Sequence, residues 1–372
     1  MAPLKLGMVG GGQGAFIGGV HLMASRLDGC FDLVAGAFSS DPDRAHASAA
    51  ELGIAADRSY ADFNEMAKAE AVRSDGIDAV SIVTPNHLHG PIAEAFLAQD
   101  ISVICDKPMT ATLVQAESLL SAAQSSKGHF FLTHNYTGYP MIRQARQMVA
   151  EGALGEVRIV EANYLQDWLS EAPAEDNKQA KWRMDPVLSG GGAIGDIGTH
   201  AYNLACFVIG QRATSLSATL RSHVAGRSVD DDARVTLRFD AGAWCHIWAS
   251  QVAIGNENNL TLAVYGSEGS LRWAQENPNV LWFSKLGQAP QMITRGGGAA
   301  GSAAVAVTRI PAGHPEGYLE AFATLYREAA GVIASQNLDG ATLGVQDGLD
   351  GVRFVDACQR SSRDEAYWID LR

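Results

Sequence analysis

The stretch Leu4–Ala15, LKLGMVGGGQGA, decides the fold of this 372-residue chain. Its apolar run Leu4–Val9 predicts a buried strand, and the next six residues, Gly10-Gly11-Gly12-Gln13-Gly14-Ala15, read G-x-G-x-x-A. A helix-like stretch, Val20–Leu27, follows the turn. Strand, glycine turn and helix in this order are typical of a dinucleotide-binding site.

Each small residue of the turn has an expected task. Gly10 permits the tight turn, Gly12 lets the backbone approach a pyrophosphate, and Ala15 lets helix and strand pack closely. The anion is expected at the helix N-terminus, where free amide groups point outward. The alternative interpretation is a glycine-rich turn with a purely structural role.

The order of the apolar runs predicts an α/β protein of two domains. Up to about residue 130, strand-like runs alternate with helix-like stretches, as in a doubly wound parallel sheet: Leu4–Val9, Phe31–Phe38, Ala79–Val83, Ile101–Cys105 and Phe130–Thr133. Later strands are longer and alternate in polarity, which favours a large, mostly antiparallel sheet: Val157–Tyr164, Ser215–Arg221, Ala233–Phe239, Ala243–Gln251 and Asn259–Tyr265. We therefore expect a Rossmann domain over 1–132 and an α+β domain with a large open sheet over 133–372.

The last third of the chain is expected to be less regular. Gly296–Ala306 is rich in glycine and alanine and predicts a mobile loop, whereas Gly317–Ser335 and Asp347–Ser361 have helical patterns.

Composition restricts the partners. The chain is 47% hydrophobic with a net charge of -13 and has no basic tract, which disfavours nucleic acid and anionic membranes. No apolar run approaches the roughly 18 residues of a membrane span, and no signal sequence is evident, so we expect a cytoplasmic protein. The five widely spaced cysteines indicate reduced thiols rather than disulfides: Cys30, Cys105, Cys206, Cys245 and Cys358.

Three further motifs carry chemistry. Thr84-Pro85-Asn86-His87-Leu88-His89 follows the third strand, and Cys105-Asp106-Lys107-Pro108 follows the fourth, so both are expected at the edge where parallel sheets bind ligands. In Gly195-Asp196-Ile197-Gly198-Thr199-His200, Asp196 and His200 are four residues apart and would share a helical face. A carboxylate, an imidazole and a lysine are the groups that oxidation of a hydroxyl needs.

The glycine turn, T-P-N-H-x-H, the D-K-P tripeptide and D-x-G-x-H, in this order, resemble the Gfo/Idh/MocA family of oxidoreductases, named after glucose-fructose oxidoreductase, inositol dehydrogenase and a rhizopine-catabolism protein. The resemblance covers essentially the whole chain. It implies a nicotinamide-binding Rossmann domain, a C-terminal domain built on an open sheet, and hydride transfer between a sugar or cyclitol carbon and the nicotinamide.

The resemblance also assigns catalytic roles. Lys107 matches the lysine beside the nicotinamide and the reacting hydroxyl, where it would stabilise developing negative charge. His200 matches the acid/base, and Asp196 would orient its ring and stabilise its protonated form. The alternative is structural: Asp196 as a helix cap, His200 in the core and Lys107 on the surface. The family usually has Glu where this chain has Asp106.

The cofactor is expected to be NAD, with NADP possible. Ser39 stands where an acidic residue would bind the 2'-hydroxyl of NAD, and Ser39, Ser40 and Arg44 are compatible with either cofactor. The complete set of expected cofactor residues is Gly10, Gly12, Gln13, Gly14, Ala15, Phe16, Ile17, Ser39, Ser40, Arg44, Thr84, Pro85, Asn86, His87, His89, Asp106 and Lys107.

His87 and His89 also raise the possibility of a metal site, because residues two apart lie on the same side of an extended chain. No further ligand is evident nearby, so a nucleotide contact is the preferred interpretation and no metal is expected.

Substrate contacts are expected from polar and aromatic side chains: Asn135, Tyr136, Gln166, Asp167, Trp168, Trp182, Arg183 and His314. Such a mixture suits a hydroxyl-rich ring, since charged and amide groups bind hydroxyls and tryptophan covers the C–H face. A packing role is the alternative for each of them. His314, in Gly313–Gly317, either lies in a helix-capping loop or reaches an active site, its own or a neighbouring subunit's.

The leading hypothesis is an NAD(P)-dependent dehydrogenase that oxidises a CH–OH group of a cyclitol or monosaccharide. The alternatives are a redox-neutral glycosidase with tightly held NAD and a non-catalytic nucleotide or sugar sensor. A homo-oligomer, tetramer or dimer, is expected, because relatives associate through the exposed face of the large sheet and an uncovered apolar face needs a partner.

Overall fold

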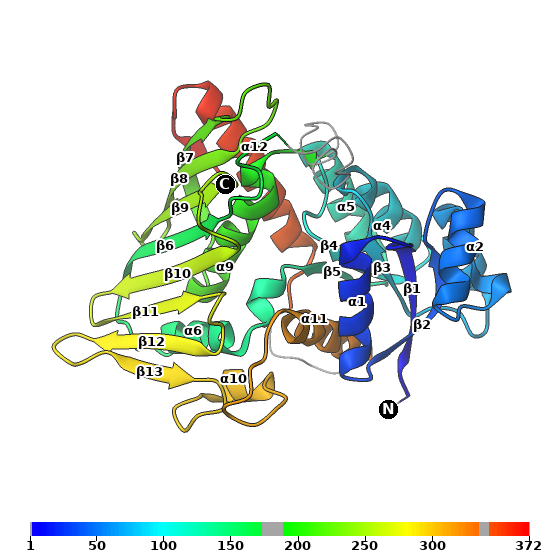
Figure 1. The fold of residues 1–372 in the computed structure, drawn as a ribbon, viewed down its shortest axis with the longest axis horizontal. Coiled ribbons are helices and arrows are strands. Elements are labelled where there is room, and N and C mark those ends of the chain that lie inside the picture. Colours follow the sequence, from blue (N-terminus) through cyan, green and yellow to red (C-terminus); the bar gives the residue numbers. More distant parts are fainter. Residues whose placement is uncertain (1, 173–188, 335–341, 372) are drawn as a thin grey trace. The chain divides into compact units, whose positions relative to one another are not determined.

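The computed structural model of the protein describes residues 2–172, 189–334 and 342–371. Within them, the strands form a five-stranded sheet, called here the parallel sheet, and a nine-stranded sheet, called here the large sheet (Figure 1). The first compact unit comprises Met1–Asn135 and Phe322–Asp350, and the second comprises Tyr136–Ala321 and Gly351–Arg372. The predicted fold class, a Rossmann sheet plus a large, mostly antiparallel sheet, is confirmed.

The parallel sheet has the strand order β2-β1-β3-β4-β5, and each neighbouring pair is parallel. Its strands are β1 (Leu4–Gly10), β2 (Phe31–Ala37), β3 (Ala79–Val83), β4 (Ser102–Asp106) and β5 (Phe130–Thr133). Every residue of β3 is buried, because helices cover both faces of such a sheet. The strand order reverses between β1 and β3, which is where ligands bind in doubly wound folds.

The helical elements between these strands are α1 (Phe16–Leu27), α2 (Pro42–Glu51), η1 (Ala56–Arg58), α3 (Phe63–Val72), η2 (Asn86–Leu88), α4 (His89–Leu97) and α5 (Leu113–Ser125). Helix α1 begins at Phe16, earlier than the predicted Val20. The closest packing of turn and helix lies at Gly18 rather than at Ala15, because a Cβ on Gly18 would stand only 2.3 Å from Gly11 Cα.

Part of the C-terminal region completes the first unit. Helix α11 (Tyr318–Ile333) places Tyr326 against the parallel sheet, where its hydroxyl lies 2.8 Å from Ser81 Oγ and 2.9 Å from His21 Nδ1. These three side chains are buried, and Ser81 Oγ also lies 3.3 Å from His21 Nδ1, so the two hydroxyl groups and this ring nitrogen satisfy one another. Helix α12 (Val345–Arg363) begins in the first unit and ends in the second.

The large sheet has the order β13-β12-β11-β10-β6-β9-β8-β7-β14. Its strands are β6 (Val157–Leu165), β7 (Ala213–Arg221), β8 (Asp232–Phe239), β9 (Trp244–Ser250), β10 (Asn259–Gly266), β11 (Gly269–Ala274), β12 (Val280–Lys285), β13 (Gln291–Thr294) and β14 (Ile369–Asp370). Neighbours are antiparallel except β6 and β9.

Alternation along the strands separates two faces of the large sheet. Leu260, Leu262 and Val264 of β10 are buried, whereas Thr261 and Tyr265 point to the other face. The helical elements of the second unit are η3 (Asn135–Gly138), α6 (Pro140–Ala150), η4 (Ile194–Gly198), α9 (Thr199–Ile209) and α10 (Ser302–Ala306). Helices α6 and α9 contact the sheet, so its buried face is the helix-covered face.

The predicted loop Gly296–Ala306 is wrong in its second half, where residues Ser302–Ala306 form α10. Side chains of α6 stabilise this short helix: Gln144 Oε1 accepts from the amide of Gly301 at 2.5 Å, and Gln147 Oε1 accepts from that of Ala303 at 2.9 Å. Composition did not reveal these caps, because they come from a distant helix.

All five cysteines are free, and three of them are buried. In the parts of the chain that the structure describes, no helix combines the length and the apolar character needed to cross a membrane.

Candidate active site

The glycine turn has the backbone that an anion-binding turn requires. Gly10, Gly11 and Gly14 have φ angles of 84°, 72° and 81°, a region that side chains disfavour. Gly12 has no room for a side chain, since a Cβ would stand 2.8 Å from the carbonyl oxygen of Phe38. Gly14 faces open space.

The start of α1 fits a pyrophosphate. Its N-cap, Ala15, provides no side-chain hydrogen bond, and its first turn, which includes Phe16 and Ile17, has no acidic residue. The first amides of the helix therefore lack a capping group from their own segment and carry the positive end of the helix dipole. This arrangement fits the diphosphate of NAD.

The end of β2 presents Ser39, Ser40 and Arg44. Ser39 Oγ accepts a hydrogen bond from the amide of Asp41 at 3.1 Å, and Asp41 in turn caps α2 through the amide of Arg44. Ser40 and Arg44 are exposed. Gln13 lies close by, with its side chain 3.0 Å from Glu51 Oε2. No carboxylate occupies position 39, in agreement with the open choice between NAD and NADP.

The two histidines of the segment after β3 have different surroundings. The buried His89 ring lies between two carbonyl oxygens, with Nδ1 2.7 Å from Pro108 O and Nε2 2.8 Å from Thr84 O. By contrast, His87 Nδ1 and Thr84 Oγ1 are buried and lack a hydrogen-bond partner among the described residues. Such orphaned polar atoms fit a bound ligand better than a packed core. Pro85 is exposed and Asn86 is buried.

Asp106 and Lys107 follow β4. Asp106 Oδ1 accepts from Thr133 Oγ1 at 3.1 Å and lies 3.7 Å from His21 Nε2. Burial alone would raise the pKa of Asp106, but His21, Lys107 and His89 stabilise its charge and keep the pKa below the usual value. Burial and the charge of Lys107 lower the pKa of His134 to about 3, so this ring is neutral at physiological pH.

Asp196 and His200 lie in consecutive turns of one continuous helical segment in the second unit. Asp196 is in the π-helical turn η4, and His200 is in the first turn of α9. Asp196 Oδ2 accepts a hydrogen bond from Gln251 Nε2 at 2.9 Å. Single π-turns within helices often occur at functional sites. Lys107, the third predicted catalytic residue, belongs to the first unit.

Buried tyrosines surround His200. The Tyr136 ring meets the His200 ring edge-on at 4.8 Å between centroids, and the Tyr136 hydroxyl lies 2.5 Å from that of Tyr164. Tyr164 donates to Asn258 Oδ1 at 2.8 Å. Burial raises the pKa of both tyrosines, so they act as neutral hydrogen-bonding groups.

Two other predicted substrate residues join this group. Gln166 Nε2 donates to Asn258 Oδ1 at 2.8 Å, and Trp168 Nε1 donates to Gln166 Oε1 at 3.0 Å. Trp168 is 41% exposed and so presents a free ring face. Asp167 accepts from the amide of Gly255 instead.

The remaining predicted substrate residues have varied positions. Asn135 is buried in the first unit, and its side-chain nitrogen lacks a partner among the described residues. Trp182 and Arg183 lie outside the described residues.

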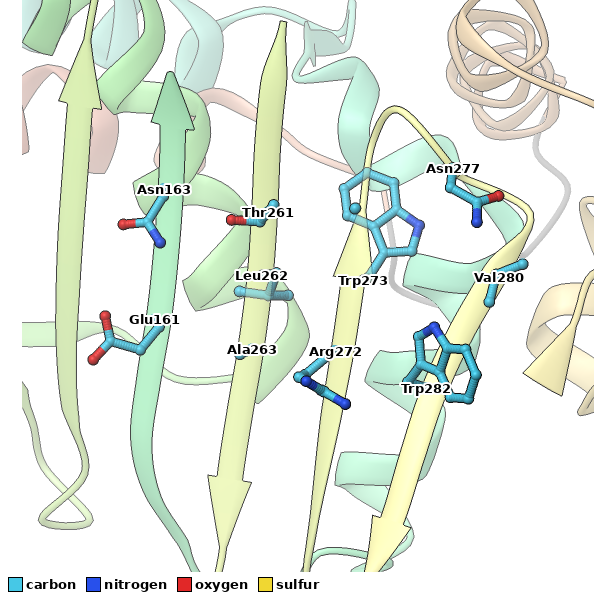
Figure 2. Close-up of a pocket in the computed structure, with 11 residues that line it drawn as sticks. Glu161, Asn163, Thr261, Leu262, Ala263, Arg272, Trp273, Asn277, Val280 and Trp282 are labelled. Carbon is cyan, nitrogen blue, oxygen red and sulfur yellow. The ribbon is translucent and has the colours of Figure 1, made fainter. Parts of the chain in front are cut away.

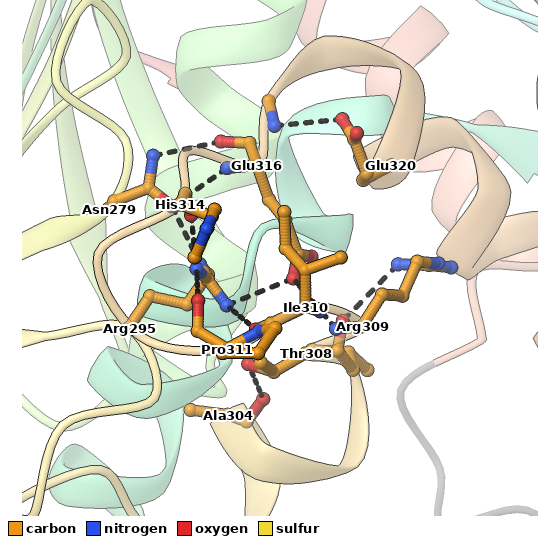
Figure 3. A network of polar contacts seen from close by, with 12 residues as sticks. Asn279, Arg295, Ala304, Thr308, Arg309, Ile310, Pro311, His314, Glu316 and Glu320 are labelled. Atoms are coloured by element: carbon orange, nitrogen blue, oxygen red, sulfur yellow. Dashed lines mark hydrogen bonds and ion pairs between the residues drawn. The ribbon is translucent and has the colours of Figure 1, made fainter.

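His314 lies exposed in a segment that a buried arginine holds (Figure 3). Arg295 donates to the carbonyl oxygens of Ile310, Pro311 and His314, to Asn279 Oδ1 and to Glu316 Oε1. Glu316 also accepts from the amides of Arg309 and Ile310, at 2.7 and 2.9 Å. This clamp was not predicted from the sequence. Glu320, not Glu316, caps α11 through the amide of Gly317.

A pocket of about 370 Å³ lies on the outer face of the large sheet, opposite the face that α6 and α9 cover (Figure 2). Residues of β6, β10, β11 and β12 line it, among them Glu161, Arg272, Trp273 and Trp282. In the described ranges, no group of three His, Cys, Asp or Glu side chains is arranged to hold a metal ion.

The sequence did not point to Tyr164, Asn258 or Gln251. Tyr164 stands two residues before the predicted Gln166–Trp168 group, which was a usable signal. Asn258 directly precedes β10 and Gln251 directly follows β9, and only the folded sheet brings them to Tyr164 and Asp196.

Residues 4–134 match the oxidoreductase family with an NAD-binding Rossmann fold, and residues 142–272 match the GFO/IDH/MocA C-terminal domain. An oxidoreductase structure from Sinorhizobium meliloti is 49% identical, with a TM-score of 0.91 over 99% of this chain and 100% of that one. An inositol dehydrogenase homolog from Azotobacter vinelandii, solved with NADH and myo-inositol, is 36% identical, with a TM-score of 0.91 over 99% and 97% of the two chains.

A levoglucosan dehydrogenase solved with NADH and levoglucosan is 26% identical, with a TM-score of 0.84 over 99% of both chains. These similarities span both units of the chain. The chain therefore belongs to the Gfo/Idh/MocA family of oxidoreductases, and its first unit contains the family's NAD-binding Rossmann domain.

Proposed function

We propose that this oxidoreductase is a dehydrogenase that oxidises a CH–OH group of a cyclitol or monosaccharide, with His200 as the acid/base. NAD, when bound, supplies the hydride acceptor. The His200 ring takes the proton of the reacting hydroxyl, and the Asp196 carboxylate stabilises the resulting imidazolium. The Lys107 ammonium donates to the substrate oxygen and stabilises its negative charge.

The observation that carries this proposal is the placement of Asp196 and His200 four residues apart in one helical segment, with His200 beside a hydrogen-bonded group of tyrosines. A buried imidazole beside neutral hydroxyl donors suits proton exchange with a polyol. Gln166 offers an amide to ring hydroxyls, and the exposed Trp168 offers an apolar face to ring C–H groups. Myo-inositol and levoglucosan, the ligands of two relatives, have this chemistry.

We further propose NAD as the physiological acceptor, with NADP as the alternative. Two of the relatives above, the inositol dehydrogenase homolog and the levoglucosan dehydrogenase, were solved with NADH, which supports NAD. The absence of a carboxylate at position 39 removes the usual repulsion of a 2'-phosphate, so NADP needs a direct test.

The test is the formation of NADH or NADPH by the purified protein with myo-inositol, scyllo-inositol, D-glucose, L-glucose and levoglucosan. We expect turnover with at least one of them. His200→Asn should lower kcat by about 10²- to 10⁴-fold while NAD binding, followed by fluorescence, is kept. His129→Asn, an exposed histidine at the start of β5, is the matched control and should keep full activity.

Two results would contradict the proposal. Tight NAD binding without turnover on any polyol would indicate a sensor, and release of a sugar from a glycoside without net NADH would indicate a redox-neutral glycosidase. Unchanged kcat in His200→Asn would remove the assigned role of His200 alone.

We also propose that the chain forms a homo-oligomer, a tetramer or dimer, through the outer face of the large sheet. Trp244, Tyr265, Trp282 and Met292 are all at least 40% exposed there. An uncovered face with several large apolar side chains favours association with a second copy. The pocket of Figure 2 lies on this face and would be covered in such an assembly.

A further inference from the structure

We propose that Asp230 and Gln251 are positioning residues that hold Asp196 in place, Asp230 through the backbone of the turn that leads into η4 and Gln251 through the carboxylate itself. The inference rests on the proposed function for the catalytic role of Asp196. The contacts that define the two anchors are independent of it.

Asp230 lies outside the helical segment in sequence and caps its N-terminal end. Its Oδ1 accepts from the amide of Gly192 at 3.0 Å, and its Oδ2 accepts from that of Ile194 at 2.7 Å. Its backbone oxygen accepts from the amide of Ala193 at 2.9 Å. Three consecutive amides are thus bound by one residue. Because η4 has no side-chain cap of its own, Asp230 replaces the missing N-cap.

The turn at Gly192 packs directly against the backbone of Asp230. A Cβ on Gly192 would stand 1.8 Å from the Asp230 carbonyl oxygen, so only glycine permits this approach. The amide of Asp196 in turn donates to Gly192 O at 2.9 Å. Any shift of the Gly192 turn is therefore transmitted to the backbone of Asp196.

Gln251 fixes the other end of Asp196. Its Nε2 donates to Asp196 Oδ2 at 2.9 Å, and the residue Gln251 as a whole is only 3% exposed. The amide of Gln251 donates to Asp231 O at 2.8 Å. A carboxylate that is hydrogen-bonded in this way has one oxygen fixed, which sets the direction of the other.

Both anchors come from one rigid junction. Asp232 of β8 pairs with Ser250 of β9, so Asp230 and Gln251 extend from the joined ends of the two strands. The fully buried Asp231 accepts from the amides of His223 and Val224 and pairs with Arg227 Nη1 at 3.0 Å. These hydrogen bonds and the ion pair stabilise the junction of β8 and β9.

The raised pKa of Asp230 agrees with a functional role for this buried carboxylate. Burial raises its pKa to about 6, despite the amide donors, and the neighbouring Asp231 carboxylate adds to the rise. Burial, and after it the charge of Asp230, raises the pKa of the Cys358 thiol of α12. A partly desolvated carboxylate costs folding free energy, and such groups are commonly retained where they serve a site.

The experiment compares Asp230→Asn and Gln251→Met with the wild type by hydrogen–deuterium exchange and by kinetics. Asn keeps the size of Asp230 but offers one acceptor instead of two, and Met keeps the length of Gln251 without a donor. We expect faster exchange of the 190–200 region in both variants. We also expect kcat to fall about 10- to 100-fold while KM for NAD stays within twofold.

Asp62→Asn is the matched control, because Asp62 caps α3 in the first unit through the amides of Asn64 and Glu65. It should leave both readouts at wild-type values. In an Asp196→Asn background, Gln251→Met should change kcat less than twofold, since both residues act through one carboxylate.

Wild-type exchange in both variants would overturn the proposal, as would a Gln251→Met effect that adds in full to that of Asp196→Asn. Should Asp230→Asn fail to fold, Gln251→Met still decides. A wild type without polyol turnover would contradict the proposed function alone, because the exchange measurement needs no substrate.

Discussion

His87 and His89 are two residues apart but have different surroundings. Both ring nitrogens of His89 face backbone carbonyls, those of Thr84 and Pro108, so this ring ties the segment after β3 to the segment after β4. His87 keeps a buried nitrogen without a partner among the described residues. A metal held by both rings would have to displace the His89 contacts, which adds a structural argument to the preference for a nucleotide contact at His87.

The side chain at position 39 should decide cofactor preference. Ser39→Asp introduces a carboxylate that accepts from the 2'-hydroxyl of NAD and repels the 2'-phosphate of NADP. We expect KM for NADP to rise at least about tenfold and KM for NAD to stay equal or fall. Steady-state kinetics with both cofactors provide the measurement, with Ser125→Asp on α5 as a charge control. A parallel rise of both KM values would be the contrary result.

The buried His134 should make the first unit sensitive to acid. Its pKa is about 3 in the folded protein, whereas a histidine of the unfolded chain titrates near ~6.5. Because the pKa of His134 is lower in the folded protein than in the unfolded chain, the neutral ring makes its full contribution to the free energy of unfolding above about pH 6.5. It is lost as the pH falls towards 3, by up to about 1.4 kcal/mol per pH unit.

His134→Gln removes this titration. From pH 7.5 to pH 5, the unfolding free energy of the variant should therefore improve relative to the wild type, as measured by urea denaturation. His129→Gln, at an exposed site, should show no such change. If the difference in unfolding free energy between wild type and His134→Gln is the same at both pH values, the lowered pKa of His134 is refuted.

At the scale of elements, the Arg295–Glu316 clamp should contribute strongly to the second unit. Both side chains are buried, and Arg295 binds three carbonyl oxygens of the segment that carries His314. Arg295→Met leaves the Glu316 carboxylate unpaired, so we expect a loss of about 3 to 5 kcal/mol in urea denaturation.

The natural comparison is Arg73, whose side chain is 30% exposed and pairs with the more exposed Asp57 and Asp75. Arg73→Met should cost no more than about 1 kcal/mol, because water screens surface pairs. Equal losses for the two variants would mean that the clamp contributes no more than an exposed pair.

The predictability of an element depended on what buries it. The strands of the parallel sheet were predicted almost residue by residue, because both of their faces are buried and their sequences are continuously apolar. Strands β11 to β13 were missed: they are only four to six residues long, and exposed side chains such as Arg272 break their apolar runs. The short helix α10 was missed because its caps come from α6.

The candidate site was predictable to a similar degree. Motifs pointed to Lys107, Asp196 and His200 as the proposed catalytic residues, because each motif is local in sequence. Gln251 and Asp230 reach η4 only after β8 and β9 have paired, and no spacing rule connects them to Asp196. The run Asp230-Asp231-Asp232 before a strand was the one available signal, because consecutive acidic residues are costly unless each has a partner.

At the scale of the whole molecule, the outer face of the large sheet should control assembly. Trp282 and Met292 are paired across β12 and β13 and are 41% and 56% exposed. Replacing both with Asp places charges where the proposed interface would exclude water, so the mass in sedimentation velocity should fall to that of a smaller species. Val114→Asp, at an exposed position of α5, should keep the wild-type mass. A monomeric wild type would contradict the proposed assembly.

The first unit is discontinuous in sequence, and this matters for its synthesis. Residues up to Asn135 contain all five strands of the parallel sheet, yet Tyr326, the partner of His21 and Ser81, comes almost two hundred residues later. During translation His21 and Ser81, which lie 3.3 Å apart, therefore lack their third partner until α11 has been synthesised. A fragment that ends near residue 135 would lack α11, so we expect the first unit to be complete only once the chain has been made beyond this helix.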